Sequence, residues 1–267
     1  MRKLSLALVS VSFFSIFATE GHAGEHFWSG DWYLTLGGAG ISGPKFEGAD
    51  SRKLSFSPII SLGRQGSGSR FSSRNDSASF AIVDTDMFRA GVAGKIVPGR
   101  DSDDYRDLEG LSDVKWGAEL GGFVDVYPTD FVRLRGELRQ GIRSHDGLVA
   151  DLSADVFTDI APDIQISGGP RARYATSGYS KAYFGVNAEE SAASGLGQYD
   201  PDGGWQSVGV GTAVTWRATE QLSTSAFAEY SRLVGPAGDS TLVDERGSKN
   251  QFMFGVSASY KFGFSLD

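Results

Sequence analysis

Cysteine is absent from the 267 residues, which excludes disulfides, thiolate metal sites and cysteine nucleophiles. Proline is scarce, with 8 copies, and the 36 glycines follow no Gly-X-Y period, so a collagen-like chain is excluded. Basic residues number 25 against 33 acidic ones. This balance argues against broad nucleic-acid binding, which depends on positive surface. We therefore expect no nucleic-acid partner. Beyond the first residues, no stretch approaches the ~18 uncharged apolar residues of a membrane-spanning helix.

The N-terminus has the three regions of a secretory leader. Arg2 and Lys3 are followed by an uncharged, mostly apolar run from Leu4 to Ala18, and Gly21 and Ala23 place small residues before a cleavage point. A membrane anchor is the weaker alternative, because a spanning helix needs ~20 apolar residues. We expect residues 1–23 to be a cleaved signal peptide and residues 24–267 to form a single domain.

The remaining chain alternates between apolar and polar residues with a period of two, which is typical of β-strands with two different faces. The contrast is strongest in residues 114–127 and 132–142, which are joined by a tight turn over 128–130. Similar strands are predicted over 32–41, 54–62, 70–83, 88–96, 148–156, 164–174, 207–216, 222–232 and 252–264. Short turns over 128–130, 158–162 and 217–221 alternate with longer segments over 98–113, 175–204 and 233–249.

These features favour an all-β, transmembrane antiparallel barrel with short periplasmic turns and long external loops. A soluble β-sandwich or a lipocalin-like barrel also alternates. However, the predicted strands reach about ten residues, and their polar face carries Arg and Glu where a small soluble barrel would be apolar. Aromatic residues near the strand ends suit interfacial girdles. Eleven strands can be drawn, and a single-chain bacterial barrel should have an even number. We predict about 12, with 10 next, and Gly24 to Trp32 as the possible twelfth.

Charged residues on the polar face are the candidate functional residues. One hypothesis is a solute-selective channel wall, since charged rings set pore selectivity. The alternative is a salt-bridge network that fills a closed lumen, because polar interiors occur in both kinds of barrel. The candidates that we expect to face the lumen are Lys115, Glu119, Asp125, Arg133, Arg135, Glu137, Arg139, Asp151, Asp155, Arg171 and Arg173.

Other motifs give little support for metal or catalytic chemistry. The acidic stretch 101–107 could bind a divalent cation, but no ligand spacing is enforced and a solvated loop is the simpler interpretation. The stretch 200–204 lacks the acidic residue of a calcium loop at Gly211. His26 and His145 are the histidines left after cleavage. An Asp–His dyad of His145 with Asp103 or Asp146 is conceivable, whereas a solvated turn histidine is the simpler interpretation. Residues 187–194 predict a short helix inside a long loop. We expect no enzymatic activity and no cofactor.

Several segments resemble the MipA/OmpV family, the MltA-interacting proteins of Gram-negative outer membranes. The resemblance spans the mature chain and rests on residues 44–50, 144–152, 183–200, 230–233 and 239–243. It implies location in the cell outer membrane, among lipid and lipopolysaccharide, and a scaffold that links a lytic murein transglycosylase to a murein synthase. Other members look like porins or adhesins, so a small-solute channel with a charged lumen, or a surface adhesin, stays the alternative. The oligomeric state stays open.

Overall fold

The computed structural model describes residues 29–64 and 71–266. The predicted signal peptide and most of the possible twelfth strand lie outside these residues. The strands are β1 Gly30–Pro44, β2 Arg52–Arg64, β3 Ala78–Asp84, β4 Phe88–Val97, β5 Gly117–Thr129, β6 Val132–Ile142, β7 Leu148–Ala161, β8 Ile164–Ala175, β9 Gly204–Arg217, β10 Leu222–Leu233 and β11 Asn250–Leu266. The helices are η1 Arg106–Leu108, α1 Ser177–Phe184, α2 Ala188–Ser194, α3 Gly235–Gly238 and α4 Thr241–Arg246.

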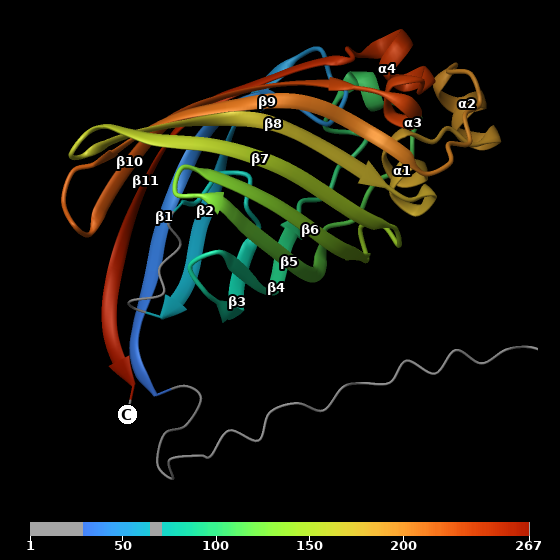
Figure 1. Ribbon diagram of the computed structural model, residues 1–267. Coiled ribbons are helices and arrows are strands. Elements are labelled where there is room, and N and C mark those ends of the chain that lie inside the picture. Colours follow the sequence, from blue (N-terminus) through green and yellow to red (C-terminus); the bar gives the residue numbers. More distant parts are fainter. Residues whose placement is uncertain (1–28, 65–70, 267) are drawn as a thin grey trace, which may run out of the picture.

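The strands form one curved sheet, in the order β2-β1-β11-β10-β9-β8-β7-β6-β5-β4-β3. Every neighbouring pair is antiparallel, and β1 pairs with β11, which places the first and last described strands side by side. The sheet curls into a nearly closed barrel with all four α-helices at one end (Figure 1). Among the described residues, no helix is long and apolar enough to cross a membrane.

The two faces of the wall follow the alternation of the sequence. Leu120, Leu134 and Val210 are 56%, 44% and 52% exposed on the outside, whereas Asp125 and Arg135 are buried inside. Along β9, the outward residues between Trp205 and Trp216 span roughly 28 Å of the barrel axis, at ~3.3 Å per residue and a tilt of ~40°. This height matches the ~25 Å apolar band of outer-membrane barrels.

The all-β barrel class is confirmed, and the strand number is close to the predicted twelve, with eleven strands described. The eleven strands drawn from the sequence are all described, but the one expected over residues 70–83 is shorter than predicted. The strand there begins only at Ala78. Ten antiparallel steps separate the edge strands β2 and β3, so these two strands run in the same direction. The chain must therefore return to the other end of the barrel between them.

Connections at the two ends of the barrel differ as predicted. Short turns join β3 to β4, β5 to β6, β7 to β8 and β9 to β10, while the segments at the helical end are longer. The turn predicted over 158–162 is tighter, because β7 continues to Ala161 and β8 begins at Ile164. The short helix predicted inside the long loop is α2, which Asn187 caps by accepting hydrogen bonds from the amides of Glu189 and Glu190.

Candidate functional site

The lumen, the space inside the barrel wall, contains a network of buried ion pairs on β5 to β8. Strand register places opposite charges side by side, because Asp125 pairs across β5 and β6 with Arg135. Arg133 likewise lies opposite Asp155 on β7. Residues directly opposite on one face of an antiparallel pair have Cβ atoms only ~5 Å apart. The alternation that sets the two faces therefore also brings these charges into contact.

Three arginines of β6 form the centre of this network. Arg133 Nη2 lies 2.8 Å from Asp155 Oδ2. Arg135 donates to Asp125 at 2.9 Å and to Glu137 at 2.7 Å. Arg139 Nε donates to Glu119 Oε2 at 2.8 Å and also contacts Glu137 and Asp151.

Two arginines of β8 extend the network to the neighbouring strands. Arg171 contacts Asp155, and Arg173 Nε lies 2.8 Å from Asp151 Oδ1. Every arginine of β6 and β8 thus has a carboxylate partner. Removing one partner of a buried pair leaves the other charge buried without compensation, which lowers the free energy of unfolding by about 3–5 kcal/mol.

His145 is a buried member of the network, not the solvated turn residue that the sequence suggested. Its side chain is 0% exposed, and its Nε2 lies 3.2 Å from Glu119 Oε1. The rings of Tyr179 and Tyr183 stand edge-on to it, with centroids 5.0 and 5.9 Å away. Gly141 makes room for this turn, since a Cβ there would lie 2.2 Å from the imidazole. His145 therefore pairs with Glu119, and neither Asp103 nor Asp146 is its partner.

Residues 71–77, which we call the lumenal strap, run through the lumen before β3 begins. The phenyl ring of Phe71 stacks on Phe157 with centroids 4.7 Å apart, and the guanidinium carbon of Arg133 lies 4.8 Å from the centroid of the Phe71 ring. Arg133 donates to both carboxylate oxygens of Asp76, at 2.7 and 2.8 Å. The backbone and hydroxyl of Ser77 donate to Glu137 at 3.1 and 2.6 Å. One side of the strap is thereby fixed to β6 and β7.

The opposite side of the strap reaches the far wall of the barrel. Asn75 Nδ2 donates to Glu229 Oε2 on β10 at 2.5 Å. The guanidinium of Arg74 lies 4.6 Å from the ring centroid of Phe227 and donates to the sulfur of Met253 on β11. The strap therefore bridges the lumen between two walls. Sequence reasoning missed it, because a short polar segment with alternating residues resembles a weak strand.

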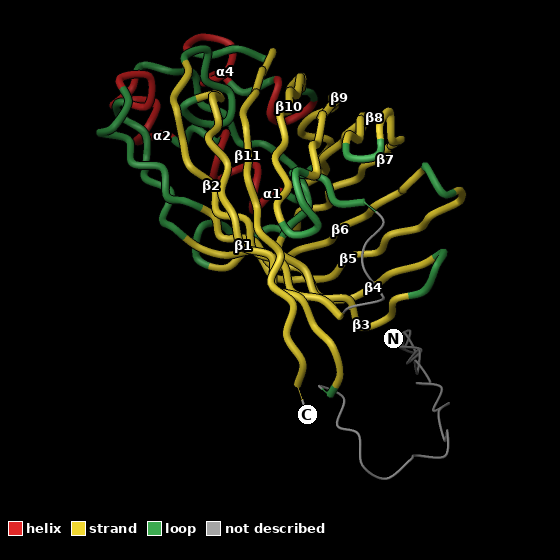
Figure 2. Tube along the Cα trace, turned by 90° about the vertical axis from the view of Figure 1, so that its left-hand side faces the viewer, coloured by secondary structure: helices red, strands yellow, loops and turns green. Residues whose placement is uncertain are grey.

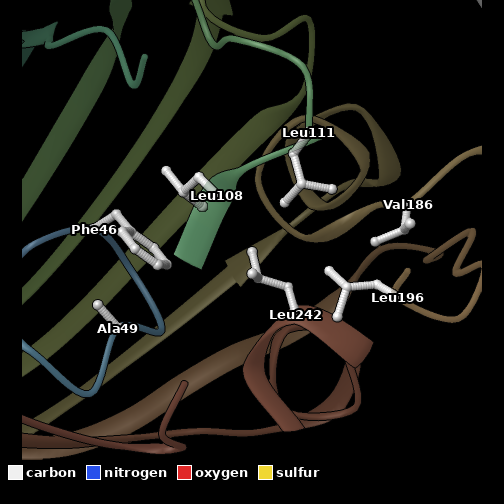
Figure 3. Packing of buried hydrophobic residues seen from close by; sticks show 7 residues of the cluster. All are labelled: Phe46, Ala49, Leu108, Leu111, Val186, Leu196 and Leu242. Carbon is white, nitrogen blue, oxygen red and sulfur yellow. The ribbon is translucent and has the colours of Figure 1, made fainter. Parts of the chain in front are cut away.

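The long segments at the helical end fold together into an external cap, comprising residues 45–51, 98–116, 176–203 and 234–249. Figure 3 shows seven apolar side chains from these segments pointing toward one another. They are Phe46, Ala49, Leu108, Leu111, Val186, Leu196 and Leu242. A second apolar cluster joins α1, α3 and α4 to the strand ends at Val149, Ala175 and Leu233. These loops thus share a core.

Polar contacts hold the cap segments to one another. Arg246 Nη1 donates to the carbonyls of Asp107 and Glu109, both at 3.2 Å, and its Nη2 contacts the carbonyl of Ser194. Arg100 donates to the carbonyl of Tyr183 at 2.8 Å. The guanidinium of Arg246 thereby joins three cap segments that are distant in sequence, namely 98–116, 176–203 and its own segment 234–249.

The remaining candidates from the sequence lie apart from the lumen. Lys115 is exposed in the loop before β5. In the acidic stretch and its flank, Asp113 Oδ1 accepts from the amide and hydroxyl of Ser102, each at 2.8 Å, and these bonds lower the pKa of Asp113. Asp200 pairs with Lys181 at 2.7 Å. Among the described residues, no group of three or more His, Asp or Glu side chains could hold a metal ion.

Comparisons with known proteins identify related barrels. The family model described as MltA-interacting protein MipA matches residues 36–262. No curated protein matches the sequence significantly.

Solved structures similar to this chain are outer-membrane proteins. An outer membrane channel from Pseudomonas putida F1 is 10% identical, with 92% of this chain and 100% of that chain covered and a TM-score of 0.45. The NanC porin is 9% identical, with coverages of 86% and 100% and a TM-score of 0.42. DcaP of Acinetobacter baumannii is 9% identical, with coverages of 87% and 98% and a TM-score of 0.39. At this distance the likeness says nothing of function.

Proposed function

The chain belongs to the family of the MltA-interacting protein MipA and is an outer-membrane β-barrel, and we propose that it is a non-enzymatic scaffold for envelope enzymes. The proposed partners are a murein-cleaving transglycosylase and a murein synthase, which the resemblance to this MltA-interacting family suggests. Both would dock at the periplasmic end of the barrel. The wall serves as a membrane anchor for this docking surface.

The occupied lumen supports a role that uses surfaces instead of transport. The arginines of β6 and β8 are paired with carboxylates, and the strap crosses between the walls. Above them, the external cap has an apolar core of its own. A salt-bridged, obstructed lumen does not favour ion passage, because conduction requires sites that ions can enter and leave.

The overhanging ends of β1 and β11 are the observation that carries the docking proposal. Figure 2 shows both strand ends, near the C-terminus, reaching beyond the rest of the sheet. β10 begins at Leu222, opposite Tyr260, so β11 has no described strand beside it on that edge beyond Lys261. Phe262 and Phe264 are 47% and 37% exposed on this overhang.

An extended segment of a partner can add to this edge as a further strand. The amide of Lys261 donates to the carbonyl of Gln221, so the amides of Gly263 and Ser265, two and four residues on, point to the same free edge. In strand addition, backbone hydrogen bonds supply affinity and alternate side chains supply specificity. A stable interface buries about 800 Å² per partner, so the neighbouring short turns would contribute the remaining contact.

Proline at position 263 tests this edge without disturbing the pairing with β1. The Gly263→Pro variant loses the outward amide alone, because that amide points away from β1, while Gly263→Ala is the matched control. We expect crosslinked envelopes to yield transglycosylase or synthase with native protein and Gly263→Ala, and much less with Gly263→Pro. Both variants should fold into heat-modifiable barrels. If the native protein recovers neither enzyme, the scaffold proposal fails for this chain.

A surface adhesin is the second candidate. It is favoured by the external cap, whose apolar core and Arg246 contacts present a fixed outer surface. Loops that carry binding residues are commonly positioned by a rigid scaffold of this kind. Binding of intact cells to a host surface that survives Gly263→Pro but is lost when the cap segment 185–200 is replaced would favour adhesion over docking.

A further inference from the structure

Two arginines on the outer wall have no acidic partner among the described residues, in contrast to the paired arginines of β6 and β8. Arg52 begins β2, and Arg232 lies near the end of β10. Both are exposed, and neither forms an ion pair with a described carboxylate within 4.0 Å. Both strands meet the external cap at these positions. The two charges therefore lie at the external margin of the apolar band, where a wall residue meets lipid headgroups.

Arg52 is held in a fixed position on the outer surface. It shares a face with Leu54 and Phe56, which are 84% and 75% exposed. Its Nη1 donates to the carbonyl of Phe252 at 2.9 Å, and its Nη2 donates to the carbonyl of Ser42 at 2.8 Å. Its guanidinium carbon lies 4.8 Å from the ring centroid of Phe254. The side chain therefore crosses β1 and ends on β11.

Arg232 reaches the same part of β11 from the other side. Its Nη1 donates to Asn250 Oδ1 at 2.9 Å, and that oxygen also accepts the hydroxyl of Tyr230 at 2.8 Å. The rings of Tyr230 and Phe252 lie 4.8 Å apart. Asn250 and Phe252 share the outward face of β11, about 7 Å apart along the strand. Two guanidinium groups thus converge on one short stretch of the outer wall.

We propose that Arg52 and Arg232 together bind a phosphate group of a lipid in the outer leaflet. Guanidinium groups bind phosphate through paired N–H donors. Directly below them, Phe254 and Val256 are 54% and 65% exposed, and they offer apolar surface to the acyl chains of the same molecule. The ligand is therefore an amphiphile with an anionic phosphate head. This inference depends on the outer-membrane location and is independent of any docking partner.

Lipid retention by the purified barrel tests the proposal. Detergent-solubilised protein is titrated with bisphosphorylated lipid A, with dephosphorylated lipid A and with inorganic phosphate, and bound lipid is measured by native mass spectrometry. We expect the double variant Arg52→Gln/Arg232→Gln to bind bisphosphorylated lipid A at least about tenfold more weakly, as the loss of charge-assisted hydrogen bonds predicts. Its binding of the dephosphorylated lipid should not change.

Arg217→Gln is the control. Arg217 ends β9 at the short turn that leads to β10, at the opposite end of the barrel from the proposed site, and it pairs with Asp159 at 3.0 Å. Arg232→Gln alone guards against misfolding, since its hydrogen bond to Asn250 is at the surface. That single variant should show an intermediate loss with unchanged heat-modifiability. Equal binding of both lipid A forms by native protein would overturn the proposal. So would an equal loss in Arg217→Gln, or full competition by millimolar inorganic phosphate.

Discussion

Asp76→Ala is the perturbation that most directly tests how the lumenal strap is held. The variant removes both oxygens that accept from Arg133, at 2.7 and 2.8 Å, and it also removes the acceptor for the amide of Ser73. Arg133 is fully buried and keeps Asp155 as its remaining partner, at 2.8 Å. The buried guanidinium therefore loses one of its two carboxylate partners.

The expected cost follows from that partial loss. Breaking a buried ion pair costs about 3–5 kcal/mol, and because Asp155 stays in place we expect the lower end, about 3 kcal/mol. Asp76→Asn keeps hydrogen-bond acceptance without the charge and should cost about half as much, since charge-assisted bonds are roughly twice as strong as neutral ones. Asp103→Ala, at an exposed position in a cap loop, is the control and should stay within about 0.5 kcal/mol of native.

Equilibrium unfolding in urea, with protein refolded into lipid vesicles, measures these differences. The single variant Arg133→Met and the double variant Arg133→Met/Asp76→Ala complete a double-mutant cycle. The double variant should lower the free energy of unfolding by about 1–3 kcal/mol less than the sum of the two single variants. If Asp76→Ala is no more destabilising than Asp103→Ala, the ion pair between Asp76 and Arg133 does not hold the strap to β6.

Two further outcomes follow from the wall and the cap. Leu134→Arg places a charge on the lipid face and should cost about 2–4 kcal/mol; it should reduce the heat-modifiable folded form, whereas Leu134→Met should not, and equal folding of the two would refute the face assignment. In α1, outside the wall, burial above all, and then the carboxylates Glu47 and Glu119, raise the pKa of Tyr183 to about 12. The neutral phenol therefore contributes stability that is fully present below its ordinary pKa of 10.0 and is lost as pH rises through about 12. Phenolate absorbance should show a late titration that Tyr183→Phe removes, and an unchanged curve would contradict the buried position.

Local patterns predicted the wall because each strand's alternation reports directly which face meets lipid. Leu134 and Arg135 illustrate this, since neighbours in a strand must point to opposite faces. The helix after Asn187 was also predictable, because its capping residues are local in sequence. The short turn at Pro128 depends equally on nearby residues.

Contacts between residues distant in sequence could not be predicted from local patterns. The partners of Arg133 come from β7 and from the strap, so they depend on strand register and on the path of residues 71–77. Eleven strands could be drawn from the sequence, but the return of the chain through the barrel before β3 becomes visible only in the assembled sheet. His145 was misjudged for the same reason, because its burial is created by Glu119 and by the tyrosines of α1.

The claim that this barrel acts through its surfaces, and not as a pore, is tested most directly by planar-bilayer recording of the purified native protein. We predict no steady conductance, because the lumen arginines are paired, the strap bridges the walls and the cap covers the external end. A reproducible open level in the native protein would contradict the account. It would do so decisively if ion selectivity changed when Arg135 or Arg171 was replaced.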